Sequence, residues 1–450
     1  MPECEVKKRD TIYAFRFVDE YPGNESRYLN AMAFFRQEQD QSSPRGFQQK
    51  SVVAVFESKL FALYRWMMSI IGPVYFQSGE AALRSAYRDT LEWPPMERLL
   101  VSKEVQLLGF AHLSRVCKNI SYNFDFCATF RYLLPKLWLL WELVMLAESV
   151  WIISPSPDVS SQAVLLLVSL ISPLEYQGDF RPFFTIRDLN ASFEEKRGPS
   201  VFGELLGVTN PYFFKAFSTW PNRIVLRGGS DAHHFCDKDK ISTQHQQVFP
   251  SQTQFLAEMQ KMINANAPSG VVGRHILKHF RSYTQAFLTP LEIYLQRAVL
   301  PNPKELRLFR TLPTPRDLQR SELLNFLKLN LKFPSDRVHF YNKFTHTFTF
   351  LRWYYRRVVS AREELKRRYL DLLNSVSVAL LFEGKSEVEV IDLYLEAKSQ
   401  LRNEGQKLGK AISERLGTLV ADMLSHISED LEQGTCHKEQ AVVSNNSEIY

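Results

Sequence analysis

Residues 133–153 read LLPKLWLLWELVMLAESVWII, and they form the most apolar stretch of this 450-residue sequence. The stretch contains Lys136, Glu142 and Glu148, and charged side chains at the centre of a bilayer are energetically unfavourable. A buried helix followed by a buried strand at Val150–Ile153 fits these residues better than a membrane-spanning helix. The sequence therefore predicts a protein that is cytosolic or peripheral to a membrane.

Downstream of this stretch, short apolar strands alternate with helices. The residues Ser154-Pro155-Ser156-Pro157 predict a turn, because proline fixes its own φ and disfavours the helical region for the residue before it. We expect Asp158 and Ser160 to supply the N-cap of a helix over Gln162–Ile171. Further strands are predicted at Pro182–Ile186, Leu205–Val208 and Ile224–Leu226, and further helices at Trp138–Ala147 and Tyr212–Ser218. This alternation with wholly apolar strands indicates a parallel sheet covered on both faces.

The first 115 residues predict a separate α/β module whose strands come early. Alternating apolar residues predict strands at Thr11–Val18 and Ser51–Phe56. Helical spacing follows over Lys59–Ile71, where Gly72-Pro73 is expected to stop the helix, and a second helix is predicted over Glu80–Thr90.

From about Phe255 onward the pattern is helical. Helices are predicted at Gln254–Ile263, Val272–Phe287, Glu292–Val299 and Arg356–Leu373, with Pro-rich breaks between the last two. Ser386 with Glu389 predicts a capping box, and a long amphipathic stripe is predicted from Leu408 to Leu431. We therefore divide the chain into an upstream module (1–115), a central α/β module (116–254, its last part a polar loop), a helical extension (255–433) and a disordered tail (434–450).

Composition excludes some classes of function. The formal net charge is +6, a mild excess that lacks the clustered cations of a nucleic-acid-binding protein and suits weak attraction to an anionic membrane surface. Aromatic residues make up 13% of the chain, as buried side chains or as contact surfaces. Five scattered cysteines argue against a disulfide framework and for a reducing compartment.

The sequence lacks the common motifs of nucleotide-binding, metal-binding and catalytic sites. Glu383-Gly384-Lys385-Ser386 is not a phosphate loop, because Ala379 stands where the first glycine is needed, and we interpret it as a helix break with a cap. His233, His234, Cys236 and His245 have the ligand types of a zinc site but not the spacing, so a solvated loop and no metal are predicted. With no nucleophile elbow either, the sequence predicts neither covalent catalysis nor a cofactor.

A basic run at residues 352–368 has three interpretations. It holds seven basic and two acidic residues, interleaved with Trp353, Tyr354 and Tyr355. An exposed, salt-bridged helix face is favoured; contact with a membrane surface or an acidic partner, and stacking on nucleic-acid bases, are the alternatives. The candidates for membrane or acidic-partner contact are Arg356, Arg357, Arg367 and Arg368.

Polar loops at the ends of the predicted parallel strands are a further candidate site. Open α/β sheets place ligand or partner contacts at the carboxyl ends of their strands. Such loops follow two of the predicted strands and lead into a third, although loops of this composition are more often plain turns. The candidate residues in them are Ser156, Asp179, Arg181 and Asn210.

A series of blocks, taken in order, resembles the DENN-domain proteins, and specifically the DENN domain-containing protein 6 family. The similarity runs from about residue 11 to about residue 430, and the order and spacing of the blocks make it specific. The blocks are FFRQ at 34–37, RGFQQKS at 45–51, LWELV at 140–144, SPSP at 154–157, ISPL at 171–174, GDFRP at 178–182, LGVTNP at 206–211 and TPLE at 289–292.

The resemblance implies a bilobed α/β protein with an all-α extension: a longin-like N-terminal lobe, and a doubly wound α/β second lobe with C-terminal helices. It implies a guanine-nucleotide releasing factor that grips a Rab GTPase between its lobes, displaces the switch regions and loosens the nucleotide without a cofactor. The four strand-end candidates would then face the Rab or shape the lobes. The sixth type is linked to recycling endosomes, so the protein is expected in the cytoplasm, recruited peripherally to those membranes.

The chain begins close to the first strand recognisable in the family pattern, whereas family members usually carry an apolar strand before it. We therefore expect a shortened longin-like module. A shortened module favours an alternative function, a DENN-fold scaffold that binds a Rab without accelerating exchange. A nucleic-acid-binding function rests on the basic run alone and is not predicted.

Overall fold

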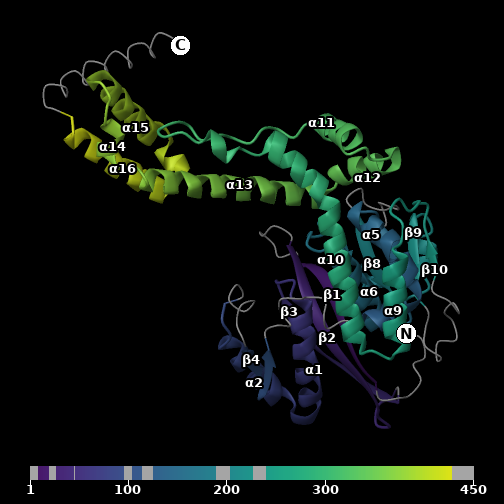
Figure 1. Ribbon diagram of the computed structural model, residues 1–450. Coiled ribbons are helices and arrows are strands. Elements are labelled where there is room, and N and C mark those ends of the chain that lie inside the picture. The colour runs from purple at the N-terminus through teal and green to yellow at the C-terminus, as the bar shows by residue number, and fades with distance from the viewer. Residues whose placement is uncertain are drawn as a thin grey trace. The chain divides into compact units, whose positions relative to one another are not determined.

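The computed structural model describes residues 9–19, 27–44, 46–95, 104–113, 125–188, 203–226 and 240–427. The chain forms two compact units: unit 1 is Met1–Leu288 with Leu327–Arg352, and unit 2 is Thr289–Phe326 with Trp353–Tyr450. The structure contains β-sheets as well as many helices, so the predicted mixture of α and β structure is confirmed (Figure 1). The predicted four-part division stays a prediction.

Unit 1 begins with an antiparallel three-stranded sheet. Its strands are β1 (Arg9–Asp19), β2 (Arg27–Gln39) and β3 (Phe47–Phe56), in the order β1-β2-β3. The strands predicted at Thr11–Val18 and Ser51–Phe56 are confirmed by β1 and β3, whereas β2 was not predicted. The middle strand is buried on both faces, because consecutive residues from Ala31 to Phe34 are at most 2% exposed. Figure 1 shows the sheet with helix α1 alongside.

Helix α1 (Phe61–Ser78) continues through Gly72 and Pro73, so the predicted stop was wrong. The ring of Phe34 lies against Gly72. Beyond the proline, the centroid of the Phe76 ring lies 5.9 Å from the centroid of the Phe34 ring. Packing on the sheet therefore extends the helix past a residue that usually ends one. Helix α2 (Glu80–Leu91) follows as predicted, and a hairpin of β4 (Glu104–Leu107) and β5 (Phe110–Leu113) comes next.

We expect Gly72→Ala to destabilise the protein by about 1–3 kcal/mol, because overpacking a core forces its neighbours to move. A Cβ at Gly72 would lie 2.2 Å from Cγ of Phe34. Gly417 lies inside a helix, and a Cβ added there would have nothing within 4 Å, so Gly417→Ala is the matched control and should stabilise by roughly 0.5–1 kcal/mol. Urea unfolding of both variants measures the difference. Equal effects of the two substitutions would contradict the packing argument.

The second sheet of unit 1 has the order β10-β9-β6-β8-β7. Its strands are β6 (Val150–Ile153), β7 (Asp179–Arg181), β8 (Glu204–Val208), β9 (Asn222–Val225) and β10 (Lys240–Ser242). Pairs β6–β8, β6–β9 and β7–β8 are parallel, and β10 runs antiparallel to β9. The parallel sheet expected from the short apolar strands is therefore present.

Strand β7 was predicted at the wrong place, at Pro182–Ile186. It lies at Asp179–Arg181, where Phe180 is 3% exposed and pairs with Leu205 of β8. Pro182 has no N–H to continue the ladder, and a 3₁₀ turn, η3 (Ile186–Asp188), follows. The apolar residues after the proline gave the wrong impression of a strand.

Helices cover both faces of this sheet. Helix α6 (Pro157–Leu170) contacts β6, β7 and β8, and on the opposite face α8 (Phe213–Ala216) packs against Trp151 and Leu206. The N-cap of α6 is Ser156, whose Oγ accepts a hydrogen bond from the N–H of Val159 (3.3 Å). The caps predicted at Asp158 and Ser160 were therefore wrong: proline at the first helical position has the φ of a helix and needs no partner for an N–H.

The apolar stretch 133–153 is, as expected, a buried helix and a buried strand. A short α4 (Phe126–Phe130) and a 3₁₀ segment, η2 (Arg131–Lys136), lead into α5 (Leu137–Met145), in which every residue is buried, and β6 follows. Within the described part of the chain, no helix is both long enough and apolar enough to span a membrane.

The remaining helices begin with α9 (Thr253–Asn264) and α10 (Ser269–Tyr294). Helix α10 runs through Pro290 into the π-helical turn η4 (Leu295–Val299), so the two helices predicted here are one. Leu291 and Tyr294 are buried and hold the turn after the proline in the helix. The segments that follow are η5 (Pro303–Glu305), α11 (Arg320–Asn325), η6 (Phe326–Asn330), α12 (Ser335–Thr345) and α13 (Phe348–Asn374).

Unit 2 is completed by α14 (Val378–Phe382), α15 (Glu387–Leu408) and α16 (Lys410–Ser425), whose buried residues surround Tyr369 and Leu416. The capping box of Ser386 and Glu389 is confirmed. The long stripe predicted from Leu408 is divided, because Gly409 has a φ of +98° and separates α15 from α16. The end of that stripe and the predicted disordered tail lie outside the described residues.

Candidate functional site

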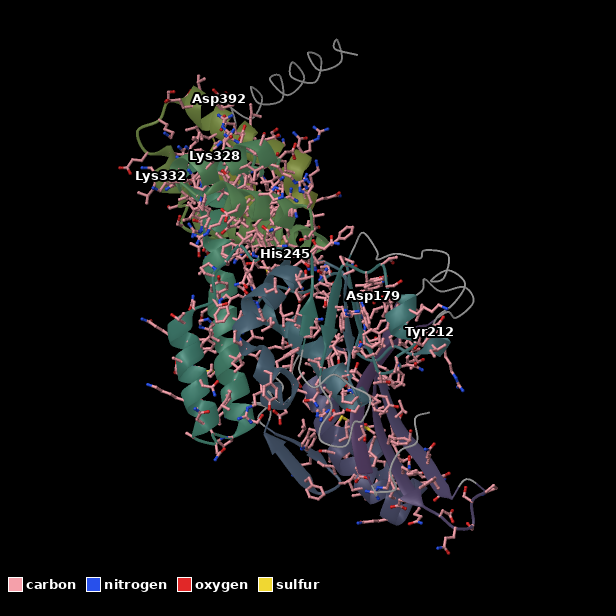
Figure 2. All side chains as sticks on the ribbon, turned by 90° about the vertical axis from the view of Figure 1, so that its right-hand side faces the viewer. Asp179, Tyr212, His245, Lys328, Lys332 and Asp392 are labelled. Atoms are coloured by element: carbon pink, nitrogen blue, oxygen red, sulfur yellow. The ribbon has the colours of Figure 1, made fainter. Side chains whose placement is uncertain are left out.

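A cluster of charged and aromatic side chains joins the two sheets of unit 1, where β1 contacts β7. Oδ2 of Asp179 accepts hydrogen bonds from the Tyr28 hydroxyl (2.8 Å) and from Nε of Arg181 (3.0 Å). Nη1 of Arg16 lies 3.7 Å from Oδ1 of Asp179 and donates to the carbonyl of Phe180 (2.8 Å). We name these four residues, Arg16, Tyr28, Asp179 and Arg181, the junction cluster, and Figure 2 labels Asp179.

The junction cluster holds two guanidinium groups and one carboxylate in a partly buried setting. The side chains of Arg16, Asp179 and Arg181 are 10%, 19% and 21% exposed, and both guanidiniums lie over the Tyr28 ring, at 4.5 and 5.8 Å from its centroid. Burial, together with the charge of Asp179, raises the pKa of Tyr28. Burial lowers the pKa of Arg16, and the charge of Asp179 opposes that change. Tyr28 is 37% exposed, so the cluster reaches the surface.

A second set of contacts joins the first module, which holds β1 to β3 and α1, to the second module, which holds β7 and α6. Nη1 of Arg65, on α1, lies 2.9 Å from Oδ1 of Asp158 on α6 and donates to the carbonyl of Ile12 on β1 (2.9 Å). Ring pairs support it: Phe61 meets Phe180 at 6.4 Å, and Tyr13 meets Phe183 at 5.3 Å. The modules are therefore joined through charge and aromatic packing on both sides of β1.

The four strand-end candidates do not gather at one place. Asp179 and Arg181 lie within strand β7 itself rather than in a loop before it, and Asp179 pairs with Glu204 at the amino ends of the strands. Ser156 and Asn210 follow the carboxyl ends of β6 and β8. The structure brings Asp179 and Arg181 together and leaves the other two apart from them.

Ser156 and Asn210 shape their local backbone. Ser156 caps α6, and its carbonyl accepts a hydrogen bond from the Ser154 hydroxyl (2.9 Å). Asn210 is exposed, and its Oδ1 accepts from the N–H of Tyr212 (2.9 Å), a residue labelled in Figure 2. Both arrangements are common turn chemistry.

The four basic candidates of unit 2 are exposed, and Arg357, Arg367 and Arg368 pair with glutamates. Arg357 forms an ion pair with Glu292. Arg367 and Arg368 share Glu364, at 2.8 and 2.7 Å, and their hydrogen bonds lower the pKa of Glu364 to about 2. Glu364 stands three and four positions before Arg367 and Arg368 on α13, so these two pairs have the geometry expected of a salt-bridged helix face.

No metal site is apparent in the part of the chain that the structure describes, where no group of three His, Cys, Asp or Glu side chains is placed to hold an ion. His233, His234 and Cys236 lie outside that part. His245 lies inside it, and its Nε2 is 2.6 Å from Oε2 of the buried Glu142.

Sequence reasoning did not single out Arg16, Tyr28 or Arg65. Their partners are 164, 151 and 93 positions away in the chain. No local pattern signals contacts of that range, and only the packing of the first module on β7 and α6 creates them.

Comparison with curated proteins finds relatives along most of the chain, although no family model matches it. The chain is 27% identical to the DENND6 homolog of Dictyostelium discoideum, over 87% of this chain and 70% of that protein. It is 27% identical to human DENND6B, over 90% of this chain and 77% of that protein. It is 26% identical to mouse DENND6A, over 92% of this chain and 76% of that protein.

These relatives and the α/β architecture indicate the class of protein that the chain resembles, the DENN-domain proteins. All three relatives are DENND6 proteins, so the resemblance of the ordered sequence blocks to the DENN domain-containing protein 6 family is confirmed.

Proposed function

We propose that this chain promotes GDP release from a Rab-family small GTPase in endosomal membrane traffic. Similarity to the DENN domain-containing protein 6 family supports the proposal, because the resemblance to that family implies nucleotide exchange. The structural observation that carries it is the junction cluster. It ties β1 and β2 to β7 through polar side chains that remain partly exposed, and a protein partner recognises such a surface.

The proposed activity needs binding energy rather than bond chemistry. An exchange factor acts when it binds the nucleotide-free GTPase more tightly than the GDP-bound form. By thermodynamic linkage, the factor then weakens GDP binding to the same extent that GDP weakens binding of the factor. No nucleophile, metal or cofactor takes part, and the groups that matter are those that bind the GTPase and those that hold the binding surface in shape.

In this proposal Asp179 positions the two cations of the junction cluster. Its carboxylate accepts a hydrogen bond from Nε of Arg181 (3.0 Å) and lies 3.7 Å from Nη1 of Arg16. One carboxylate therefore orients two guanidinium groups. Arg181 also donates to the Tyr28 hydroxyl (3.2 Å). We propose that Arg181 and Tyr28, the more exposed members, face the GTPase, and that Asp179 and Arg16 hold the two modules in register.

We further propose that the protein acts in the cytoplasm and is recruited peripherally to recycling endosomes, where a lipid-anchored Rab resides. Ser156 and Asn210 are assigned to shaping the loops of the second module, because their contacts are with their own backbone.

The reciprocity of linkage supplies a test of this function. Immobilised Rab proteins, each prepared nucleotide-free and GDP-loaded, are titrated with the purified chain. For at least one Rab we expect the nucleotide-free form to bind roughly 5- to 150-fold more tightly, with added GDP dissociating the complex. Equal affinity for the two forms would identify a scaffold that binds the Rab without exchanging its nucleotide, and the proposal would be rejected.

A further inference from the structure

Residues 306–312 of unit 2, which read LRLFRTL, lie outside the helices and strands and pack against α13 and α15. Their anchor is Phe309, which is 3% exposed and belongs to the same core cluster as Tyr369 of α13. Three leucines of the segment are partly buried against that cluster: Leu306, Leu308 and Leu312. We name residues 306–312 the docked segment.

Two buried side chains of the helices hold the backbone of the docked segment. The Tyr369 hydroxyl accepts a hydrogen bond from the N–H of Phe309 (3.3 Å), and Nε2 of Gln400 donates to the carbonyl of Arg310 (2.7 Å). The two side chains orient each other, because the Tyr369 hydroxyl donates to Oε1 of Gln400 (2.6 Å). Tyr369 is 0% exposed and Gln400 5%. Hydrogen bonds to backbone atoms do not depend on the side chains of the bound segment, so this pair can hold another peptide in the same way.

Helix α15 places three polar side chains along the docked segment. Glu396, Gln400 and Glu404 are four positions apart, so they lie on one face of the helix. Glu396 forms an ion pair with Arg310, and Oε1 of Glu404 accepts a hydrogen bond from the Thr311 hydroxyl (2.7 Å). A carboxylate therefore stands on each side of the amide that binds the backbone, and this arrangement favours basic side chains in a bound peptide.

The docked segment leaves part of this arrangement unsatisfied. Among the residues that the structure describes, none donates a hydrogen bond to Oε2 of Glu404, although that atom is buried. The Thr311 hydroxyl has one hydrogen to donate, whereas a lysine ammonium at the same position would have three and the opposite charge. Phe309 has a φ of +57°, which is unfavourable for any residue except glycine. A peptide without these two features would fit better than the docked segment does.

We propose that Tyr369, Glu396, Gln400 and Glu404 form a peptide-binding site, and that the docked segment is its intramolecular ligand. The site takes a short segment of a partner protein in which an apolar anchor is followed directly by two basic residues, at the positions of Arg310 and Thr311. The second cation pairs with Glu404. Exchange of one segment for the other breaks no helix or strand, because residues 306–312 belong to none.

The test is fluorescence anisotropy of two labelled peptides with the full chain. The resident peptide has the sequence of residues 303–314, and the basic peptide is the same sequence with Thr311→Lys. In the wild type the docked segment competes as a tethered ligand, so the chain with Phe309→Ala, which lacks the anchor, should bind both peptides at least about tenfold more tightly. The basic peptide should bind this variant about fivefold more tightly than the resident peptide.

Glu404→Gln, added to Phe309→Ala, is the matched control for the charge. It should bring the two peptides within about twofold of each other, because the carboxylate that distinguishes them is gone. The backbone contacts of Tyr369 and Gln400 remain in this double variant, so the resident peptide should still bind.

A second measurement does not require Phe309→Ala to fold. In the full chain, Thr311→Lys places a cation beside Glu404 and should raise the melting temperature. Thr314→Lys adds the same charge at an exposed position and should leave the melting temperature unchanged.

Three results would overturn the inference. The first is equal binding of the peptides to the wild type and to Phe309→Ala. The second is a basic peptide that binds no more tightly than the resident peptide, and the third is equal melting temperatures of Thr311→Lys and Thr314→Lys. The measurements use no GTPase, so their failure is distinguishable from failure of the exchange proposal.

Discussion

Replacing Glu142 by glutamine is expected to lower the free energy of unfolding by about 3 kcal/mol, because the buried acceptor of several donors is lost. Glu142 is 0% exposed, and its carboxylate accepts from the N–H groups of Val248 (3.0 Å) and Phe249 (2.6 Å). Nε2 of His245 lies 2.6 Å away. In the variant, the amide NH₂ would face one or more of these donors, leaving them without an acceptor.

The loop around His245 depends on this carboxylate. The N–H of His245 donates to Oγ1 of Thr243 (3.0 Å), which donates in turn to Oδ1 of Asn222 on β9 (2.6 Å). Glu142 therefore sits at the end of a hydrogen-bonded chain that runs from the sheet to α5. We expect hydrogen exchange to quicken in residues 243–249 of the variant before it does so elsewhere.

Urea unfolding of Glu142→Gln, His245→Ala and the double variant measures the coupling between the two side chains. His245→Ala removes one donor and should lower stability by about 1–2 kcal/mol, and the double variant should lose less than the sum of the two. If Glu142→Gln stays within about 0.5 kcal/mol of the wild type, the carboxylate does not hold the loop as described.

Replacing Arg181 by alanine is expected to reduce the exchange rate more than tenfold, roughly 1.4 kcal/mol of transition-state stabilisation, while the melting temperature stays near that of the wild type. Stability is preserved because, in this variant, Asp179 retains its hydrogen bond from the Tyr28 hydroxyl (2.8 Å) and its ion pair with Arg16 (3.7 Å). Asp179→Ala is expected to reduce exchange as well, and to lower stability by about 1–3 kcal/mol, because two partly buried guanidiniums lose their carboxylate.

Arg84, on α2 and 77% exposed, provides the control, and Arg84→Ala should change neither exchange nor melting temperature. Nucleotide release and thermal unfolding are measured on all three variants. A large fall in the melting temperature of Arg181→Ala without a specific exchange defect would show that Arg181 serves the structure alone.

Local patterns in the sequence predicted the elements whose signals are local. Alternation located β1 and β3, the apolar run located α5 and β6, and the spacing of Ser386 and Glu389 located the start of α15. The errors arose where packing overrides a local signal. Packing against Phe34 keeps α1 helical beyond Pro73. The apolar residues after Pro182 suggested a strand, but the strand that pairs with β8 lies before the proline, at Asp179–Arg181.

The site was less accessible to sequence reasoning than the fold. Asp179 and Arg181 were picked out from their sequence block, but Arg16 and Tyr28 carried no signal of their own. The basic run shows the same limit of sequence reading: counting charges does not reveal that Arg357 has a partner 65 positions away. Long-range pairing is a property of the folded chain.

Nucleotide release from a panel of Rab GTPases tests the central claim most directly. Each Rab is loaded with the fluorescent analogue mant-GDP, and the loss of fluorescence is followed in excess unlabelled nucleotide with and without the purified chain. We predict that release from at least one Rab accelerates more than tenfold, in proportion to the concentration of the chain, with no GTP hydrolysed by the chain itself. Release that stays at its spontaneous rate for every Rab in the panel would contradict the account.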